Sequence, residues 1–243
     1  MKLIFSWRKS IWQILSCVLL SEMLLGGGAL ASDAEVFAKG NQAFHQGQWE
    51  DALKAYHALP KDFAVLYNLG STYFKQGQLG KAIYYFKWAL QEMPRDPDAR
   101  FNLKYVREKT GALELARPWH SYLALPLNAA EGWWLAGMVL LILAVGLSLH
   151  RKWVLWILVL AVPVLAAQVE QQRFFGQIAI AGQEVKVYSS PSAEGILLFT
   201  LPEGSEVRMT HDGTAAENWA VVELGPQKKG WALKSNLVAD ARP

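Results

Sequence analysis

The chain is poor in charge and almost free of cysteine. Only 19% of its 243 residues are charged, against roughly a quarter in an average soluble domain. Its formal net charge of +3 gives no basic excess of the kind that nucleic-acid binding requires. The single cysteine, Cys17, excludes an internal disulfide framework and a cysteine-rich metal site. Apolar residues are in excess instead, at 52%, and they include 11 Trp, whose rings collect at membrane interfaces.

Sequence motifs for catalysis are also missing. The 5 His are scattered, and none has the H-x-x-x-H or H-E-x-x-H spacing of a metal site. Cys17 lies in the N-terminal apolar region, so no Cys–His nucleophile is expected in the mature chain. The only glycine run, 26–28, lies in the same region and forms no phosphate-binding loop. We therefore expect no enzyme, no cofactor and no metal site.

The first 31 residues predict an export signal. A basic segment at 2–9 precedes an apolar run at 11–25, and an Ala-x-Ala cleavage site ends at Ala31. A cleaved signal peptide over 1–31 is one interpretation, and an uncleaved signal anchor is the other. Both place the following residues outside the cytoplasm.

Two apolar segments predict a transmembrane hairpin. Residues 132–149 and 153–169 have no polar stripe, and they flank a basic turn at 150–152, which we expect on the cytoplasmic side. The alternative is a buried helical hairpin in a soluble protein. We expect linkers at 118–131 and 170–176, and the hairpin leaves both flanking domains on the same outer side.

The segment 32–117 has the spacing of a helical repeat. Gly70 and Ala82 are small where two antiparallel helices would cross closely, and Pro94 would end the second helix. The expected core positions are Leu66, Leu69, Tyr73 and Phe86. This pattern resembles the 34-residue tetratricopeptide repeat.

A less regular copy precedes this repeat. Gly40 stands thirty residues before Gly70, and we expect the second helix of this copy to be about one turn short because Pro60 stops it. Residues 98–109 predict a closing helix, with Gly111 at its C-terminal end.

Resemblance to tetratricopeptide repeats implies a concave groove that binds peptides or helices. The groove positions are Phe37, Asn41, Phe44 and His45 in the first copy, Tyr67, Ser71, Phe74 and Lys75 in the second, and Phe101 and Tyr105 in the closing helix. Aromatic side chains favour an apolar or proline-containing segment over a terminal carboxylate. In the alternative interpretation these aromatics pack under the closing helix or against the membrane-side linker.

Residues 177–243 change to the period of two that is typical of strands. The alternating apolar positions are Ile178, Ile180, Val185, Val187, Val207, Met209 and Val221. Turn signals separate about five or six short strands, which predicts a small all-β barrel.

The order of motifs in this segment resembles a bacterial SH3-like domain. The matching motifs are Val185-Lys186-Val187-Tyr188-Ser189, Leu201-Pro202-Glu203-Gly204, Trp219-Ala220-Val221 and Gly230-Trp231-Ala232. Resemblance to such domains implies recognition of cell-wall peptides or protein docking. Tyr188 takes the place of the usual Arg, and Tyr188, Trp219 and Trp231 are the candidate surface residues, with barrel core and rim as the alternative role of the two tryptophans.

The expected fold is therefore a multidomain membrane protein: an all-α tetratricopeptide domain, a two-helix transmembrane hairpin and a small all-β SH3-like barrel. This combination resembles the E-type proteins of the Bat (Bacteroides aerotolerance) operons. Their resemblance implies an inner-membrane protein with periplasmic domains. It further implies von Willebrand factor A-domain membrane proteins and a MoxR-type ATPase as partners, with a role in envelope or oxidative-stress tolerance.

The expected function is a non-catalytic membrane scaffold that holds protein partners through the repeats and the barrel. One rival is an envelope sensor whose barrel binds peptidoglycan. Another is a membrane assembly factor that uses its Trp-rich hairpin as the contact surface.

Overall fold

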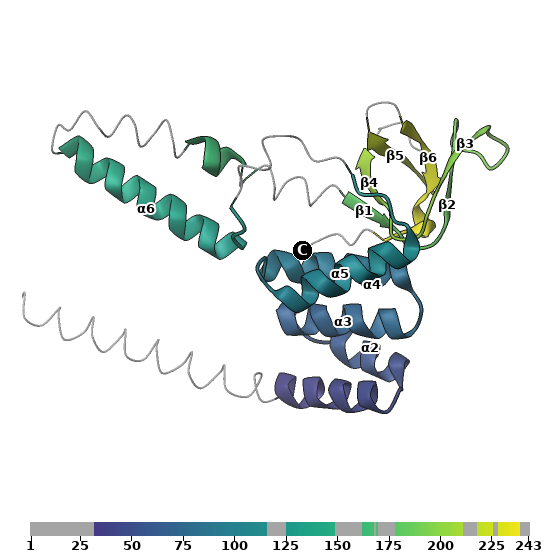
Figure 1. Cartoon of the computed structure of the whole chain (residues 1–243), viewed down its shortest axis with the longest axis horizontal. Helices are drawn as coiled ribbons and strands as arrows, with labels where there is room; N and C mark the ends of the chain where they lie inside the picture. The colour runs from purple at the N-terminus through teal and green to yellow at the C-terminus, as the bar shows by residue number, and fades with distance from the viewer. Residues whose placement is uncertain are drawn as a thin grey trace, which may run out of the picture. The chain divides into compact units, whose positions relative to one another are not determined.

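The computed structural model describes residues 32–115, 125–148, 162–167, 169, 178–210, 218–225 and 228–238 (Figure 1). The predicted signal at 1–31 lies outside these residues, as do the predicted turn at 150–152 and the linker at 170–176. Two compact units divide between Pro60 and Lys61. Helices come first along the chain, and an antiparallel sheet follows them.

The first unit contains a pair of helices. A helix over 32–45 leads through Gly47, whose φ of 74° suits glycine, into α2 (Trp49–His57). Gly40 packs closely against the Tyr56 ring, where a Cβ would come within 3.0 Å of the ring atoms. α2 has 9 residues and the corresponding helix of the next repeat has 14, so the expected shortening before Pro60 is confirmed.

Three helices open the second unit: α3 (Phe63–Lys75), α4 (Leu79–Glu92) and α5 (Pro97–Thr110). Asp62 and Asp96 cap the starts of α3 and α5, since each carboxylate accepts a hydrogen bond from the backbone N–H three residues further on. α5 ends at Gly111, which takes the left-handed conformation with φ of 64°. The predicted end of the closing helix is confirmed.

The core of this repeat is the one that the spacing predicts. Gly70 allows the close approach of α3 and α4, because a Cβ there would come within 3.0 Å of the Phe86 ring. The expected core side chains are all buried: Leu66, Leu69, Tyr73, Ala82 and Phe86. Gly70 and Phe86 therefore repeat the pairing of Gly40 and Tyr56 thirty residues later.

Helix α6 (Ala129–Ser148) covers most of the first predicted span. Asn128 and Glu131 form a capping box at its start: the Asn128 side chain accepts from the Glu131 N–H at 2.8 Å, and the Asn128 N–H donates to Glu131 at 3.0 Å. Arg95 pairs with Glu131. Among the described residues, which for the second span are 162–167 and 169 only, we find no helix with both the length and the apolar character needed to cross a membrane. The described part of the chain therefore gives the predicted hairpin no support.

The β-domain, residues 178–238, is one antiparallel sheet. The described residues hold seven strands in the order β3-β2-β6-β5-β4-β1-β7, one or two more than expected. Their bounds are β1 Ile178–Ala181, β2 Val185–Tyr188, β3 Leu197–Leu201, β4 Glu206–Thr210, β5 Trp219–Gly225, β6 Lys228–Leu233 and β7 Leu237–Val238. β7 has two residues, too few to show an alternating pattern in the sequence.

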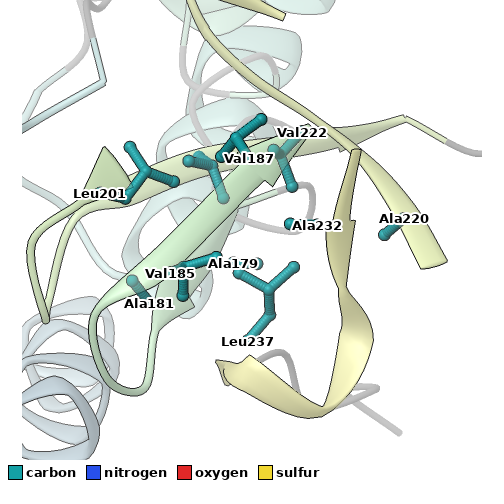
Figure 2. Packing of buried hydrophobic residues seen from close by; sticks show 10 residues of the cluster. Ala179, Ala181, Val185, Val187, Leu201, Ala220, Val222, Ala232 and Leu237 are labelled. Atoms are coloured by element: carbon teal, nitrogen blue, oxygen red, sulfur yellow. The ribbon is translucent and has the colours of Figure 1, made fainter. Parts of the chain in front are cut away.

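The inner face of the sheet is lined by small aliphatic side chains (Figure 2). The cluster consists of Ala179, Ala181, Val185, Val187, Leu201, Val207, Ala220, Val222, Ala232 and Leu237, with Phe199, Met209 and Leu224 packed against it. Ile180 and Val221, which were expected on the inner face, lie outside this cluster, because their neighbours Ala179 and Ala220 take the inward positions. Successive residues of a strand point to opposite faces, so Ile180 points away from this cluster, and it is still buried because β1 packs beside α4.

A junction joins the β-domain to α4 and α5. The Glu203 carboxylate accepts a hydrogen bond from the Gly80 N–H at 2.7 Å. Glu206 pairs with Lys87 at 2.8 Å and with Arg107, and all three side chains are largely buried. Glu206 also donates its backbone N–H to the Leu113 carbonyl at 2.8 Å.

Candidate functional site

Helices α3 and α5 bring together three of the predicted groove residues. Phe74 and Tyr105 meet edge to face with ring centroids 5.9 Å apart, and Phe101 stacks with Tyr105 at 6.5 Å. Their spacing of four residues places Phe101 and Tyr105 one above the other on α5. The side chains of Phe101 and Tyr105 are 69% and 49% exposed. We call Phe74, Phe101 and Tyr105 the aromatic patch.

The three members of the aromatic patch differ in their exposure. Aromatic rings that served only to pack the closing helix α5 against α3 would be buried between the two helices. Phe74 is half-buried and fits that role in part. Phe101 leaves most of its side chain in solvent and Tyr105 about half, so both rings are open to a ligand.

Tyr67 has a different role from the aromatic patch. Its ring contacts Phe86 at 5.7 Å, and its hydroxyl accepts a hydrogen bond from the Asn102 side chain at 2.9 Å. Tyr67 therefore ties α3 to α5 below the aromatic patch. Asn102 was not among the sequence candidates, although its place next to Phe101 on the closing helix could have suggested it.

One cation contacts the aromatic patch. The Lys109 ammonium lies 5.4 Å from the centre of the Phe74 ring, within the range of a cation–π contact. Lys75, a predicted groove residue, is exposed at the end of α3, and Ser71 is half-buried one turn before it. Lys109 is a site residue that the sequence reasoning missed, because the repeat pattern assigns no groove position to the last turn of the closing helix.

In the first unit the predicted groove residues make internal contacts. Phe37 lies 5.8 Å from Tyr56, and Asn41 accepts a hydrogen bond from the Tyr56 hydroxyl at 2.8 Å. Phe44 meets Trp49 edge to face at 5.2 Å, and His45 is exposed beside it. Packing within this helix pair therefore accounts for Phe37, Asn41 and much of Phe44.

The β-domain gathers its three candidate aromatics on one surface. Tyr188 and Trp219 meet edge to face at 5.8 Å, and Tyr188 is opposite Trp231 in the pairing of β2 with β6. All three are half-buried, so part of each ring is open to solvent. None of them belongs to the aliphatic core cluster, which lies on the other face.

Acidic and imidazole side chains do not converge into a metal site in the described ranges. No group of three or more His, Cys, Asp or Glu side chains there could hold a metal ion. The titratable side chains that do cluster in a buried position there are Glu206, Lys87 and Arg107 at the junction. Burial raises the pKa of the Glu206 carboxyl, but Lys87 and Arg107 lower it by more, so the net pKa lies below its ordinary value.

Comparison with protein families matches residues 63–96 to the tetratricopeptide repeat. The match starts at the first residue of α3 and ends in the turn between α4 and α5. It confirms the more regular of the two predicted copies. No curated protein matches the chain.

Proposed function

We propose that the chain is a non-catalytic scaffold whose repeat helices bind a segment of a partner protein. A tetratricopeptide repeat indicates protein–protein interaction in general, and the repeat here is intact in its core and its turns. The observation that carries the proposal is the aromatic patch, which keeps Phe101 and Tyr105 exposed on the closing helix.

The chemistry of the aromatic patch defines the segment that it fits. Aromatic faces bind apolar and proline-containing segments, whose extended form loses little entropy on binding. Lys75 and Lys109 on its margin favour a carboxylate next to that apolar stretch. We therefore propose an apolar segment flanked by an acidic residue as the ligand.

Capture by the full-length chain in intact membranes tests this proposal. Photo-crosslinking from position 101 should yield a discrete protein adduct that identifies the partner. Co-purification of that partner with the chain that carries no crosslinker should be lost in the double substitution F101A/Y105A, while the fold stays unchanged. The matched control is Met93→Ala, which removes a side chain that is 48% exposed at the end of α4 and outside the aromatic patch. Equal capture by F101A/Y105A and wild type would overturn the assignment.

We also propose attachment to the bacterial inner membrane through the segment 132–169, with the repeats and the β-domain on the periplasmic side. The two apolar runs of the sequence support it, together with the tryptophans at their ends. Alkaline carbonate extraction separates integral from peripheral proteins. Retention of the chain in the pellet is expected, and its release into the supernatant would contradict attachment.

The partners proposed from the family resemblance are Bat-type membrane proteins with von Willebrand factor A domains and a MoxR-type ATPase system, acting in envelope or oxidative-stress tolerance. Mass spectrometry of the position-101 adduct identifies the protein bound at the aromatic patch. An adduct with an unrelated protein would keep the scaffold role and remove this assignment.

A second candidate function is an envelope sensor that binds peptidoglycan through the β-domain. The observation that favours it is the half-exposed group of Tyr188, Trp219 and Trp231 on one face of the sheet. Co-sedimentation of the full-length chain with purified cell wall tests it. Binding that is lost in Trp231→Ala supports the sensor, and no sedimentation of the wild type removes it.

A further inference from the structure

The contacts at the junction are those of a folded interior. Glu206 and Lys87 have side chains that are 4% and 8% exposed, and they pair at 2.8 Å. Charges this deeply buried are costly unless each one is matched, so neither side could keep this arrangement without the other. Arg107 completes the cluster from α5 and also pairs with Glu114 at 2.9 Å.

At two glycines of the junction, the β-domain and α4 lie so close together that a Cβ would not fit. A Cβ at Gly80, in the first turn of α4, would come within 3.0 Å of the Ala181 carbonyl oxygen in β1. A Cβ at Gly204, between β3 and β4, would come equally close to the Ile83 side chain. Gly80 needs no special backbone conformation, so it is the proximity of β1 that makes a side chain unfavourable there.

The junction also buries an apolar side chain of the β-domain. Ile180 is 1% exposed although it points away from the β-domain core. Directly opposite residues in an antiparallel pair share a face, and Ile180 is opposite Glu206, which contacts α4 and α5. The face of β1 and β4 that would be the outer surface of an isolated β-domain is therefore an interior here.

We propose that the β-domain is a built-in cap of the repeat helices, so that α4, α5, β1 and β4 fold and unfold as one cooperative unit closed by Glu206. This goes beyond the proposed function, which treats the repeats and the β-domain as two binding surfaces. The partner of this face is the chain itself. External partners are left with the aromatic patch and with the part of the outer sheet face that carries Tyr188, Trp219 and Trp231 on β2, β5 and β6.

The sign of one substitution tests the cap. Ala is favoured over Gly inside a helix, so Gly80→Ala should slow amide hydrogen exchange in α4 if the β-domain were an independent neighbour. In a single unit, the new Cβ pushes against Ala181, and exchange should become faster in α4 and in β1 by about tenfold or more. Gly137→Ala in α6 is the matched control, because nothing lies within 4 Å of a Cβ at that position.

A second variant keeps the test independent of steric strain. Glu206→Gln preserves the size of the side chain and removes the buried negative charge that Lys87 and Arg107 share. Faster exchange that extends across α4, α5 and β4 in the full-length chain supports the single unit. Glu223→Gln is its control, because Glu223 pairs with Lys229 at 3.1 Å between two strands of the β-domain.

The opposite results are equally clear. Slower or unchanged exchange in α4 of Gly80→Ala would overturn the proposal. So would a change in Glu206→Gln that stays within the β-domain and leaves α4 and α5 protected. If Gly80→Ala does not fold, the comparison of Glu206→Gln with Glu223→Gln decides.

Discussion

Glu203 caps the first turn of α4 from a position 123 residues further along the chain, where its carboxylate accepts the Gly80 N–H at 2.7 Å. The helix has no cap of its own, because the Gln78 side chain accepts no hydrogen bond from the N–H groups of the first turn and no acidic residue lies in that turn. Free N–H groups at a helix start favour a negative charge, so the β-domain supplies what the helix lacks.

Removal of this cap should destabilise α4. We expect Glu203→Ala to lower the free energy of unfolding by about 0.5–2 kcal/mol, the usual cost of losing a helix N-cap. Urea unfolding of the full-length chain, followed by far-UV circular dichroism, measures the change. Glu184→Ala, an exposed glutamate just before β2, should leave stability almost unchanged. Equal effects of the two substitutions would remove the capping role of Glu203.

Gly70 is predicted to resist replacement despite its place inside a helix. Gly70→Ala gains helix propensity of about 1 kcal/mol but overpacks the contact with the buried Phe86 ring, at a cost of about 1–3 kcal/mol. We expect a net loss of stability of about 1 kcal/mol. Phe86→Leu in the same chain should recover part of it, because the smaller side chain makes room. Additive effects in the double-mutant cycle would show that Gly70 and Phe86 do not interact.

The hydrogen bond between Tyr67 and Asn102 should stabilise the closing helix against α3. Tyr67→Phe removes the hydroxyl and should cost about 0.5–1.5 kcal/mol, the net contribution of one such bond. Asn102→Ala should cost a similar amount, and the double variant should cost little more than either. Thermal unfolding of the four proteins measures the coupling. Ser71→Ala, which removes a hydroxyl from the same helix, is the control.

The ion cluster at Glu206 predicts a loss of stability in acid. The pKa of Glu206 lies below its ordinary value of 4.5, so folding favours the charged form. Its contribution is present above about pH 4.5 and is lost as the pH falls through the lower pKa of the folded state. The urea midpoints of wild type and Glu206→Gln, measured from about pH 7 to about pH 3, should differ at neutral pH and converge in acid. A constant difference over this range would contradict the linkage.

Much of the repeat could be predicted from local spacing. Gly70, Ala82 and Phe86 fix where two helices cross, and such contacts join residues close in sequence. The closing helix was predicted for the same reason, since Gly111 marks its end, while its cap at Asp96 was not predicted. The structure adds Asn102 and Lys109 to the site, whose roles depend on how α5 rests on α3 and not on any motif.

The junction could not be predicted from the sequence. Glu206 belongs to a strand that alternates normally, and Lys87 sits in a helix whose core is set by its neighbours. Their pairing links positions 119 residues apart along the chain, so no periodicity connects them. Ile180 was expected to point inward for a related reason: the sequence shows an apolar residue on β1, but both faces of this strand are buried, and alternation cannot tell them apart.

Glu206 also fixes where the two ends of the chain segment between α5 and β1 lie. Its backbone N–H donates to the carbonyl of Leu113, just after α5, and the pairing of β1 with β4 places it opposite Ile180. Leu113 and Ile180, which precede and follow the stretch 114–179, are therefore both held at Glu206. Loss of the contacts of Glu206 would therefore release both ends of this stretch at once.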